Sequence, residues 1–185
     1  MIEDVYKDAE ERMKKAVEAL KRDMLSIRTG RATPSLIDRL PIEYYGTPTP
    51  LNQLATINAP EARLLVVQPF DKGTLPLIEK ALQRGDMGFN PSNDGRVIRI
   101  PIPPLTEDRR RDMVKQVKHK VEEGRVAIRN IRRDVMHDLK EMETEKMISE
   151  DDHKRGAEKI EDIVHKYIRE AEHVGDAKEA EVMEV

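Results

Sequence analysis

The stretch that decides the fold covers residues 106–142 and reads TEDRRRDMVKQVKHKVEEGRVAIRNIRRDVMHDLKEM. Thr106, followed by Glu107 and Asp108, is a suitable helix start, because a hydroxyl caps free amides and carboxylates favour a helix N-terminus. After it, apolar residues and one glycine recur every three or four positions: Val114, Val117, Val121, Gly124, Ile128, Ile131, Val135, Leu139 and Met142. This spacing predicts a helix of roughly 60 Å whose apolar stripe needs partner helices.

Two further segments can supply those partners. Residues 1–29 carry a stripe with the same spacing, formed by Ile2, Tyr6, Ala9, Met13, Ala16, Leu20, Met24 and Ile27. Residues 149–152, Ser-Glu-Asp-Asp, have the composition of a capping box and predict the start of a third helix. Its stripe is Ala157, Ile160, Val164, Tyr167, Ala171 and Val174. Three long stripes that cannot be buried alone predict an elongated antiparallel three-helix bundle.

Proline and glycine set the middle of the chain apart. All 11 prolines lie between Pro34 and Pro104, and six of the nine glycines lie between Gly30 and Gly95. Residues 42–45, 63–68 and 97–100 have strand composition, residues 74–84 have helical spacing before Gly85, and residues 93–95 indicate a turn. The sequence therefore predicts the α+β class. Residues 1–30 and 105–185 form the bundle, and residues 31–104 form an inserted small β-rich domain with one short helix.

The composition excludes several classes. Charged residues make up 37% of the chain but aromatic residues only 3%, too few for a β-sandwich or an aromatic-lined enzyme pocket. Cysteine is absent, which removes disulfides and thiolate metal sites. No run of about 18 apolar residues exists, and the charged N-terminus does not read as a signal peptide. We expect a soluble, cytoplasmic protein without a membrane partner.

Charge is distributed unevenly along the 185 residues. Residues 106–133 contain 10 basic and 5 acidic residues, a net charge of +5, whereas residues 134–185 contain 8 basic and 17 acidic residues, a net charge of −9. Within the basic part, seven positions share one helix face next to the apolar stripe: Arg111, Lys115, Lys118, Glu122, Arg125, Arg129 and Arg132. Arg133 lies beside this face, and Arg28 and Arg31 add charge at the end where the inserted domain joins the bundle.

Two interpretations of this basic face stay open. Clustered cations repel one another, so the face is expected to be exposed and to bind a polyanion such as the RNA or DNA backbone. Alternatively, it is a solvated helix face that acidic residues of the third helix partly neutralise.

No catalytic, metal or cofactor site is predicted. The five histidines have no ligand spacing, and Gly85-Asp86-Met87-Gly88 lacks the Lys and the following Ser or Thr of a phosphate-binding loop. Tyr44 and Tyr45 could stack on bases, although strand alternation predicts that one of them is in the core. The sequence thus indicates a binding protein and not an enzyme.

Seven segments closely resemble the bacterial ribosome recycling factor family. They are IRTGRATPS (27–35), EYYGTPTPL (43–51), NP (90–91), IRIP with PPLTE (98–101 and 103–107), RVAIRNIRRD (125–134) and ISEDD (148–152). The matches span nearly the whole chain in order, and together they are highly specific.

The resemblance implies an L-shaped, two-domain molecule that acts after peptide release. With elongation factor G and GTP, such proteins split the post-termination ribosome into subunits. The bundle would bind large-subunit ribosomal RNA, with Arg129 and Arg132 in contact with RNA and Arg28, Gly30 and Arg31 near the tRNA end site. Lys118, Arg125 and Arg133 join this RNA-binding set through the basic face. GTP hydrolysis would belong to the partner, which agrees with the missing phosphate-binding loop.

Two short crossings between the domains are candidates for a hinge, formed by Gly30, Arg31, Ala32, Pro103, Pro104 and Leu105. Gly30 provides backbone freedom, whereas Pro103 and Pro104 restrict it. We expect a monomer. The alternative is a coiled-coil adaptor or chaperone that uses the bundle as a protein-binding rod. An RNA-cleaving enzyme would need convergent carboxylates or histidines, and the sequence does not reveal any.

Overall fold

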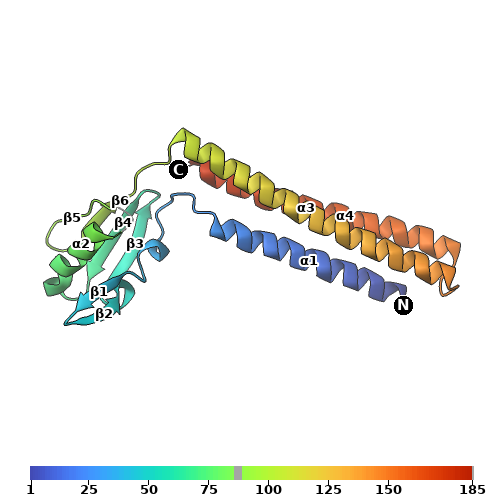
Figure 1. Ribbon diagram of the computed structural model, residues 1–185, viewed down its shortest axis with the longest axis horizontal. Coiled ribbons are helices and arrows are strands. Elements are labelled where there is room, and N and C mark those ends of the chain that lie inside the picture. The colour runs from blue at the N-terminus through green and yellow to red at the C-terminus, as the bar shows by residue number, and fades with distance from the viewer. Residues whose placement is uncertain (86–88, 185) are drawn as a thin grey trace. The chain divides into compact units, whose positions relative to one another are not determined.

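The computed structural model describes residues 1–85 and 89–184, which divide into two compact units (Figure 1). The first unit combines Met1–Arg28 with Glu107–Glu184, and the second comprises Thr29–Thr106. Of the Gly85–Gly88 segment that lacks a phosphate-binding motif, only Gly85 lies among the described residues.

Three long helices form the first unit: α1 (Ile2–Ser26), α3 (Glu107–Thr144) and α4 (Glu150–Glu184). Each of the three contacts the other two, and Figure 1 shows α3 running antiparallel to both α1 and α4. A tight turn joins α3 to α4, and there Lys146 adopts a left-handed backbone conformation with φ of 61°. The predicted antiparallel three-helix bundle is confirmed.

The start of α4 shows the predicted capping box. The Ser149 hydroxyl accepts a hydrogen bond from the Asp152 backbone N–H at 3.0 Å. In return, the Asp152 carboxylate accepts one from the Ser149 backbone N–H at 3.3 Å. The Ser149 side chain and then its backbone N–H, both as hydrogen-bond donors to the carboxylate, lower the pKa of Asp152. The box satisfies two backbone donors that a helix start leaves free.

The core of the bundle follows the predicted stripes with small shifts. Val17 is buried where Ala16 was expected, and Ala16 is half-buried. On α4, Gly156 and Gly175 are buried, whereas the neighbouring Ala157 and Val174 are only partly covered. The largest fully buried side chains of this core are Met13, Ile128, Leu139 and Ile160. Small residues at these contacts indicate that the helix backbones approach one another closely.

Within residues 29–85 and 89–106, the second unit contains two antiparallel sheets and one short helix. Strands β1 (Pro41–Tyr44) and β2 (Thr47–Pro50) form a hairpin. Strands β3 (Ala55–Glu61), β4 (Leu64–Pro69), β5 (Ser92–Asn93) and β6 (Ile98–Pro101) form a sheet in the order β3-β4-β6-β5. Helix α2 (Leu75–Arg84) and three short 3₁₀ turns complete the unit. Its separate core includes Ile42, Leu65, Ile78, Leu82 and Ile98.

The predicted strands correspond to β1, β4 and β6, each within one residue of its expected bounds, and the predicted helix corresponds to α2. Sequence reasoning missed β2, β3 and β5. Strand β2 reads Thr-Pro-Thr-Pro, and β3 contains Asn58 and Pro60, which are poor strand formers. Proline is tolerated in β2 because this strand pairs with β1 only, so its other edge needs no backbone donors.

The expectation that Tyr44 or Tyr45 is in the core is wrong. Tyr45 is 87% exposed and Tyr44 is half-buried. Tyr45 and Gly46 both have positive φ, 48° and 78°, so the chain reverses here and strand alternation does not apply. The two tyrosine rings instead pack edge to face, with their centroids 4.5 Å apart.

Candidate nucleic-acid interface

The candidate interface is the basic face of α3. Lys115, Lys118, Arg129 and Arg133 are exposed, as the sequence predicted, but Arg125 and Arg132 are half-buried. Both half-buried arginines lie against α4, which the sequence pattern of α3 alone does not reveal. Part of the basic face therefore lies at the contact between α3 and α4.

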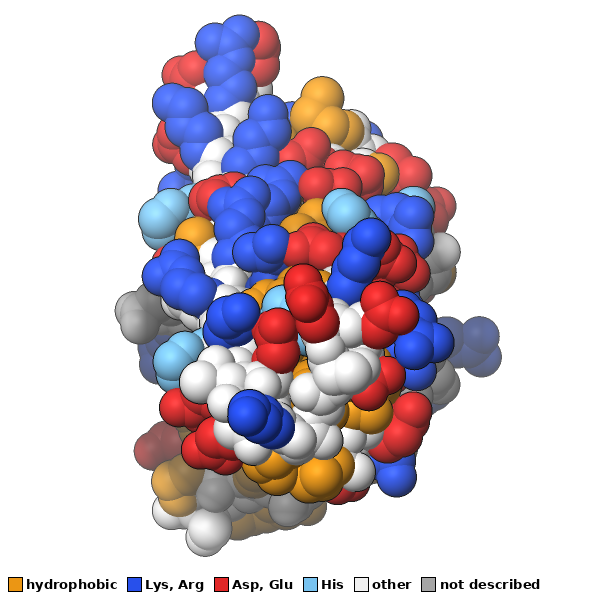
Figure 2. Space-filling model, turned by 90° about the vertical axis from the view of Figure 1, so that its right-hand side faces the viewer, with side chains coloured by type: hydrophobic (Ala, Val, Ile, Leu, Met, Phe, Trp, Pro, Cys, Tyr) orange, Lys and Arg blue, Asp and Glu red, His pale blue; other side chains and the backbone are white. Residues whose placement is uncertain are grey.

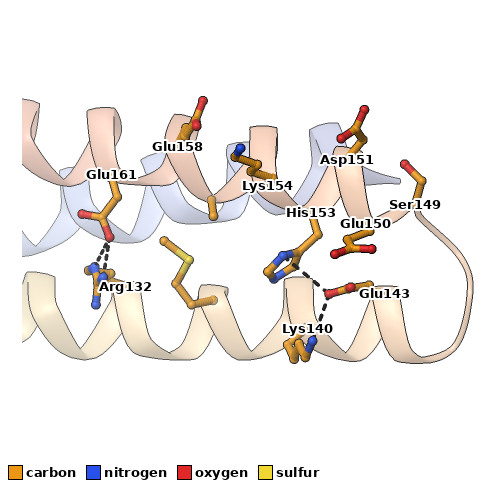
Figure 3. A pocket seen from close by; sticks show the side chains of 12 residues that line it. Arg132, Lys140, Glu143, Ser149, Glu150, Asp151, His153, Lys154, Glu158 and Glu161 are labelled. Carbon is orange, nitrogen blue, oxygen red and sulfur yellow. Dashed lines mark hydrogen bonds and ion pairs between the residues drawn. The ribbon is translucent and has the colours of Figure 1, made fainter.

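Arg132 is held by a carboxylate of α4. Its Nε donates a hydrogen bond to Glu161 Oε1 at 2.6 Å, and its Nη2 forms an ion pair with the same oxygen. Figure 3 shows the two side chains pointing toward each other across the helices. Both keep substantial exposure, 43% for Arg132 and 36% for Glu161, so this pair remains accessible to a ligand from solvent.

Arg125 and Arg129 share a carboxylate on their own helix. Glu122 accepts hydrogen bonds from Arg125 Nη1 at 3.0 Å and from Arg129 Nη1 at 3.1 Å. Arg125 Nη2 also reaches Glu172 of α4 at 3.3 Å. The hydrogen bond to Glu122 raises the pKa of Arg125 against the opposing effect of burial, and the bond to Arg125 lowers the pKa of Glu122.

These pairs correct one step of the sequence reasoning. The repulsion expected among clustered cations is relieved by Glu122, Glu161 and Glu172, so helix packing accounts for part of the pattern. The net charge of −9 over residues 134–185 was the signal for such neutralisation. It could not identify Glu161 and Glu172, because the register between α3 and α4 decides which acids of α4 meet the arginines, whereas Glu122 lies on the predicted face itself.

Three exposed cations on or beside the basic face of α3 have no acidic partner among the described residues. Lys115, Lys118 and Arg133 are exposed, and within residues 1–85 and 89–184 none of them forms an ion pair. Figure 2 views the bundle from the end where α3 joins α4, and there Lys and Arg gather in a band interrupted by Asp and Glu. The surface thus combines free cations with arginines that carboxylates hold in place.

The remaining predicted residues lie elsewhere. Arg28 follows α1 and lines a pocket of about 280 Å³ together with Ser26, Ile27, Arg109, Asp112, Met113 and Gln116. Along α3, Arg109 and Arg129 are 20 residues apart, or about 30 Å, so Arg28 does not join the cluster around Arg129. Gly30 and Arg31 belong to the second unit.

Next to Arg132, a groove of about 1040 Å³ follows α3 and α4 to the turn that joins them (Figure 3). Its charged lining is mixed: Arg132, Lys140, Lys154, His153, Glu143, Glu150, Asp151, Glu158 and Glu161. Inside it, Glu143 binds Lys140 Nζ at 3.1 Å and lies 3.5 Å from His153 Nδ1. The ion pairs in this groove thus form within and between α3 and α4.

The described part of the chain contains no group of three or more His, Cys, Asp or Glu residues that could hold a metal ion. Among the same residues, no helix is long and apolar enough to cross a membrane.

The fold and the site together define a class of α+β protein in which a long three-helix bundle, interrupted by a small antiparallel β domain, presents a row of arginines. The family model described as "Ribosome recycling factor" matches residues 20–183. The ribosome-recycling factor of Roseiflexus sp. (strain RS-1) is 53% identical over 185 residues, covering 100% of both chains. That of Halalkalibacterium halodurans is 55% identical with the same coverage.

Two solved structures are also similar. A solution structure of the ribosome recycling factor has a TM-score of 0.65 and 42% identity, covering 100% of this chain and 98% of that one. Models of the T. thermophilus ribosome recycling factor and E. coli elongation factor G, bound to the E. coli post-termination complex, give a TM-score of 0.60 and 45% identity, covering 98% of each chain. The chain belongs to the ribosome recycling factor family. This is a family of non-enzymatic translation factors, so the prediction that the chain is not an enzyme is confirmed.

Proposed function

We propose that the chain binds the post-termination ribosome at large-subunit ribosomal RNA and, with elongation factor G and GTP, promotes its dissociation into subunits. It would act as a monomer in the cytoplasm. The observation that supports RNA binding is the row of cations on α3, with Lys115, Lys118, Arg129 and Arg133 exposed. A similar ribosome recycling factor is bound, together with elongation factor G, to a post-termination complex.

The ion pairs of the face are compatible with phosphate binding. A guanidinium has five N–H donors, and Arg132 directs two of its nitrogens at Glu161. The other donors of Arg132 can form charge-assisted hydrogen bonds with a phosphate, which are among the stronger contacts in proteins. We therefore assign RNA binding to Arg125, Arg129, Arg132, Lys118 and Arg133. Arg28, Gly30 and Arg31 would form a separate contact.

We also propose that the two crossings form a hinge. In the second unit, a Cβ on Gly30 would lie 3.0 Å from Leu105, so the two crossings touch each other there. Ala32 is buried, and its N–H donates to Ala62 O at 2.7 Å, which fixes it to the body of that unit. We therefore assign the hinge to the two crossings, which would bend together because they touch; its residues are Gly30, Arg31, Ala32, Pro103, Pro104 and Leu105.

Cosedimentation with purified large ribosomal subunits at low and high salt tests RNA binding. We expect Arg132→Ala to weaken binding by about 1–3 kcal/mol while circular dichroism stays unchanged. Arg169→Ala is a matched control, because Arg169 is an exposed arginine on α4, outside the proposed set. Equal binding by the wild type and Arg132→Ala would refute the assigned face, and no binding by the wild type would favour a protein-binding rod.

Light scattering of post-termination ribosomes tests the recycling step. Addition of the chain with elongation factor G and GTP should lower the scattering as ribosomes split, and omission of either factor should abolish the change. Scattering that falls equally without the chain would contradict the proposed function.

A further inference from the structure

The carboxylate of Glu161 is placed to control the direction of Arg132. Its Oε1 is approached by both Nε and Nη2 of Arg132, so this edge of the guanidinium is held toward α4. A contact to one nitrogen alone would leave the guanidinium free to swing about that hydrogen bond. Glu161 itself lies on α4, which packs along α3, so the arginine is fixed against a second helix.

The same geometry leaves room for a ligand. With Nε and one N–H of Nη2 directed at Glu161, both N–H groups of Nη1 and the second N–H of Nη2 remain available. The Arg132 side chain is 43% exposed, so these donors can be reached from solvent. A phosphate can therefore bind Arg132 while Glu161 keeps its place.

Two opposing effects decide what Glu161 does to RNA affinity. Its negative charge repels a phosphate, but at an exposed site several ångströms away this changes affinity by less than about threefold, and salt reduces it further. The ion pair with Glu161 also restricts the rotamers of Arg132 before RNA binds. Binding then loses less side-chain entropy, which raises the affinity by about two- to tenfold. The second range extends above the first, and a control that removes the same charge without touching Arg132 separates the two effects.

We propose that Glu161 is a positioning residue for RNA binding, which holds Arg132 in the orientation that meets a phosphate of ribosomal RNA. The inference rests on the proposed function. It gives the acidic helix α4 a role in a surface that the sequence assigns to α3 alone.

The chain offers a matched control. Glu158 lies one turn away on the same helix and lines the same groove as Glu161. Its carboxylate points away from Arg132 in Figure 3, and within the described residues it forms no ion pair or side-chain hydrogen bond. Removal of Glu158 thus changes the local charge by the same amount without releasing Arg132.

The experiment measures the affinity of full-length variants for purified large ribosomal subunits at about 50 mM and about 200 mM salt. We expect Glu161→Ala to bind about two- to tenfold more weakly, with the same salt dependence as the wild type, because the phosphate contact is kept but less favourable. Glu158→Ala should bind as tightly as the wild type or slightly more tightly. Glu161→Gln keeps an acceptor for Arg132 and should restore binding to within about twofold of the wild type.

A double-mutant cycle separates positioning from a general effect on the fold. In the Arg132→Ala background, Glu161→Ala should have no further effect on affinity. The inference is overturned if Glu161→Ala binds as tightly as Glu158→Ala, or if its effect persists without Arg132. If the wild type itself does not bind, the proposed function fails and the inference fails with it. If the wild type binds and Arg132→Ala weakens binding, the proposed function stands. A Glu161→Ala variant that binds as tightly as Glu158→Ala, or whose effect persists without Arg132, would then refute the role of Glu161 alone.

Discussion

Gly175 of α4 lies directly against Val121 of α3. A Cβ placed on Gly175 would overlap the Cγ2 methyl of Val121, so only glycine fits at this point of the bundle. Val121 cannot easily turn away, because a β-branched side chain in a helix has one strongly preferred rotamer. The contact lies next to Arg125 and Glu172, which line the same groove between α3 and α4. The close approach of the backbones therefore brings the cations of α3 near the acids of α4.

We predict that Gly175→Ala destabilises the bundle. Overpacking of this kind costs about 1–3 kcal/mol, which outweighs the gain of about 1 kcal/mol in helix propensity. Gly124→Ala is the matched control, because its Cβ would lie 3.3 Å from the flexible end of Leu20, and it should be nearly neutral. Thermal unfolding followed by circular dichroism at the helix band measures both.

A second substitution should restore part of the stability that Gly175→Ala loses. Val121→Ala removes the methyl group that the new Cβ would meet, so the double variant should unfold at a higher temperature than the sum of the single effects requires. A Gly175→Ala variant as stable as the wild type would show that the helices can separate without cost.

A second prediction compares two glycines of the β-rich unit. Gly30 and Gly46 have φ of 76° and 78°, which alanine adopts at a cost of about 1 kcal/mol. A Cβ would meet nothing within 4 Å at Gly46, but it would contact Leu105 at 3.0 Å at Gly30. We therefore expect Gly30→Ala to reduce amide hydrogen-exchange protection in β3 and β4 more than Gly46→Ala does. Equal loss in the two variants would mean that Leu105 moves aside freely.

Part of this structure could be predicted from the sequence, because the spacing of apolar residues along a helix shows which of its faces is buried. The stripes that contain Met13, Ile128 and Ile160 identify three helices and their buried faces. The hairpin strand β2 could not be predicted, since its prolines are acceptable only at an edge that the sequence does not reveal. The pairing of Arg132 with Glu161 was also hidden, because 29 positions of chain separate them and the register between α3 and α4 decides the contact.

A third prediction concerns the salt dependence of ribosome binding. Replacement of Arg125, Arg129 and Arg132 together by Ala should reduce the slope of log affinity against log salt concentration by about two to three phosphate equivalents. Their acidic partners do not change this expectation, because a guanidinium has five N–H donors and each of these arginines directs only some of them at carboxylates. Filter binding or cosedimentation over a range of salt concentrations measures the slope. A slope equal to that of the wild type would show that these arginines do not meet phosphate.

The fourth prediction is a pH dependence that arises at Asp94, in the turn between β5 and β6. Its Oδ1 accepts hydrogen bonds from the backbone N–H groups of Arg96 at 2.9 Å and Val97 at 3.0 Å. Its Oδ2 accepts one from Arg99 Nη1 at 2.9 Å. The hydrogen bond from Val97, followed by those from Arg96 and Arg99, lowers the pKa of Asp94 from 3.8 to about 2.

Because the folded state holds this carboxylate at a lower pKa than the unfolded chain, the charge of Asp94 stabilises the fold above about pH 4. That stability is lost as the pH falls through about 2, where the folded carboxylate is protonated. Asp94→Asn keeps an oxygen acceptor for the turn but has no charge to lose. We therefore expect it to be less stable than the wild type at pH 7, with a difference that shrinks below about pH 4 and vanishes only below about pH 2.

Nuclear magnetic resonance gives a direct measurement. The backbone amide signals of Arg96 and Val97 should shift with a midpoint near pH 2 in the wild type, and the corresponding step should be missing in Asp94→Asn. Hydrogen exchange of β6 at pH 7 and at lower pH reports the stability difference. A midpoint near 3.8 would show that the turn does not hold the carboxylate in solution, and the predicted convergence of the two proteins at low pH would then have no basis.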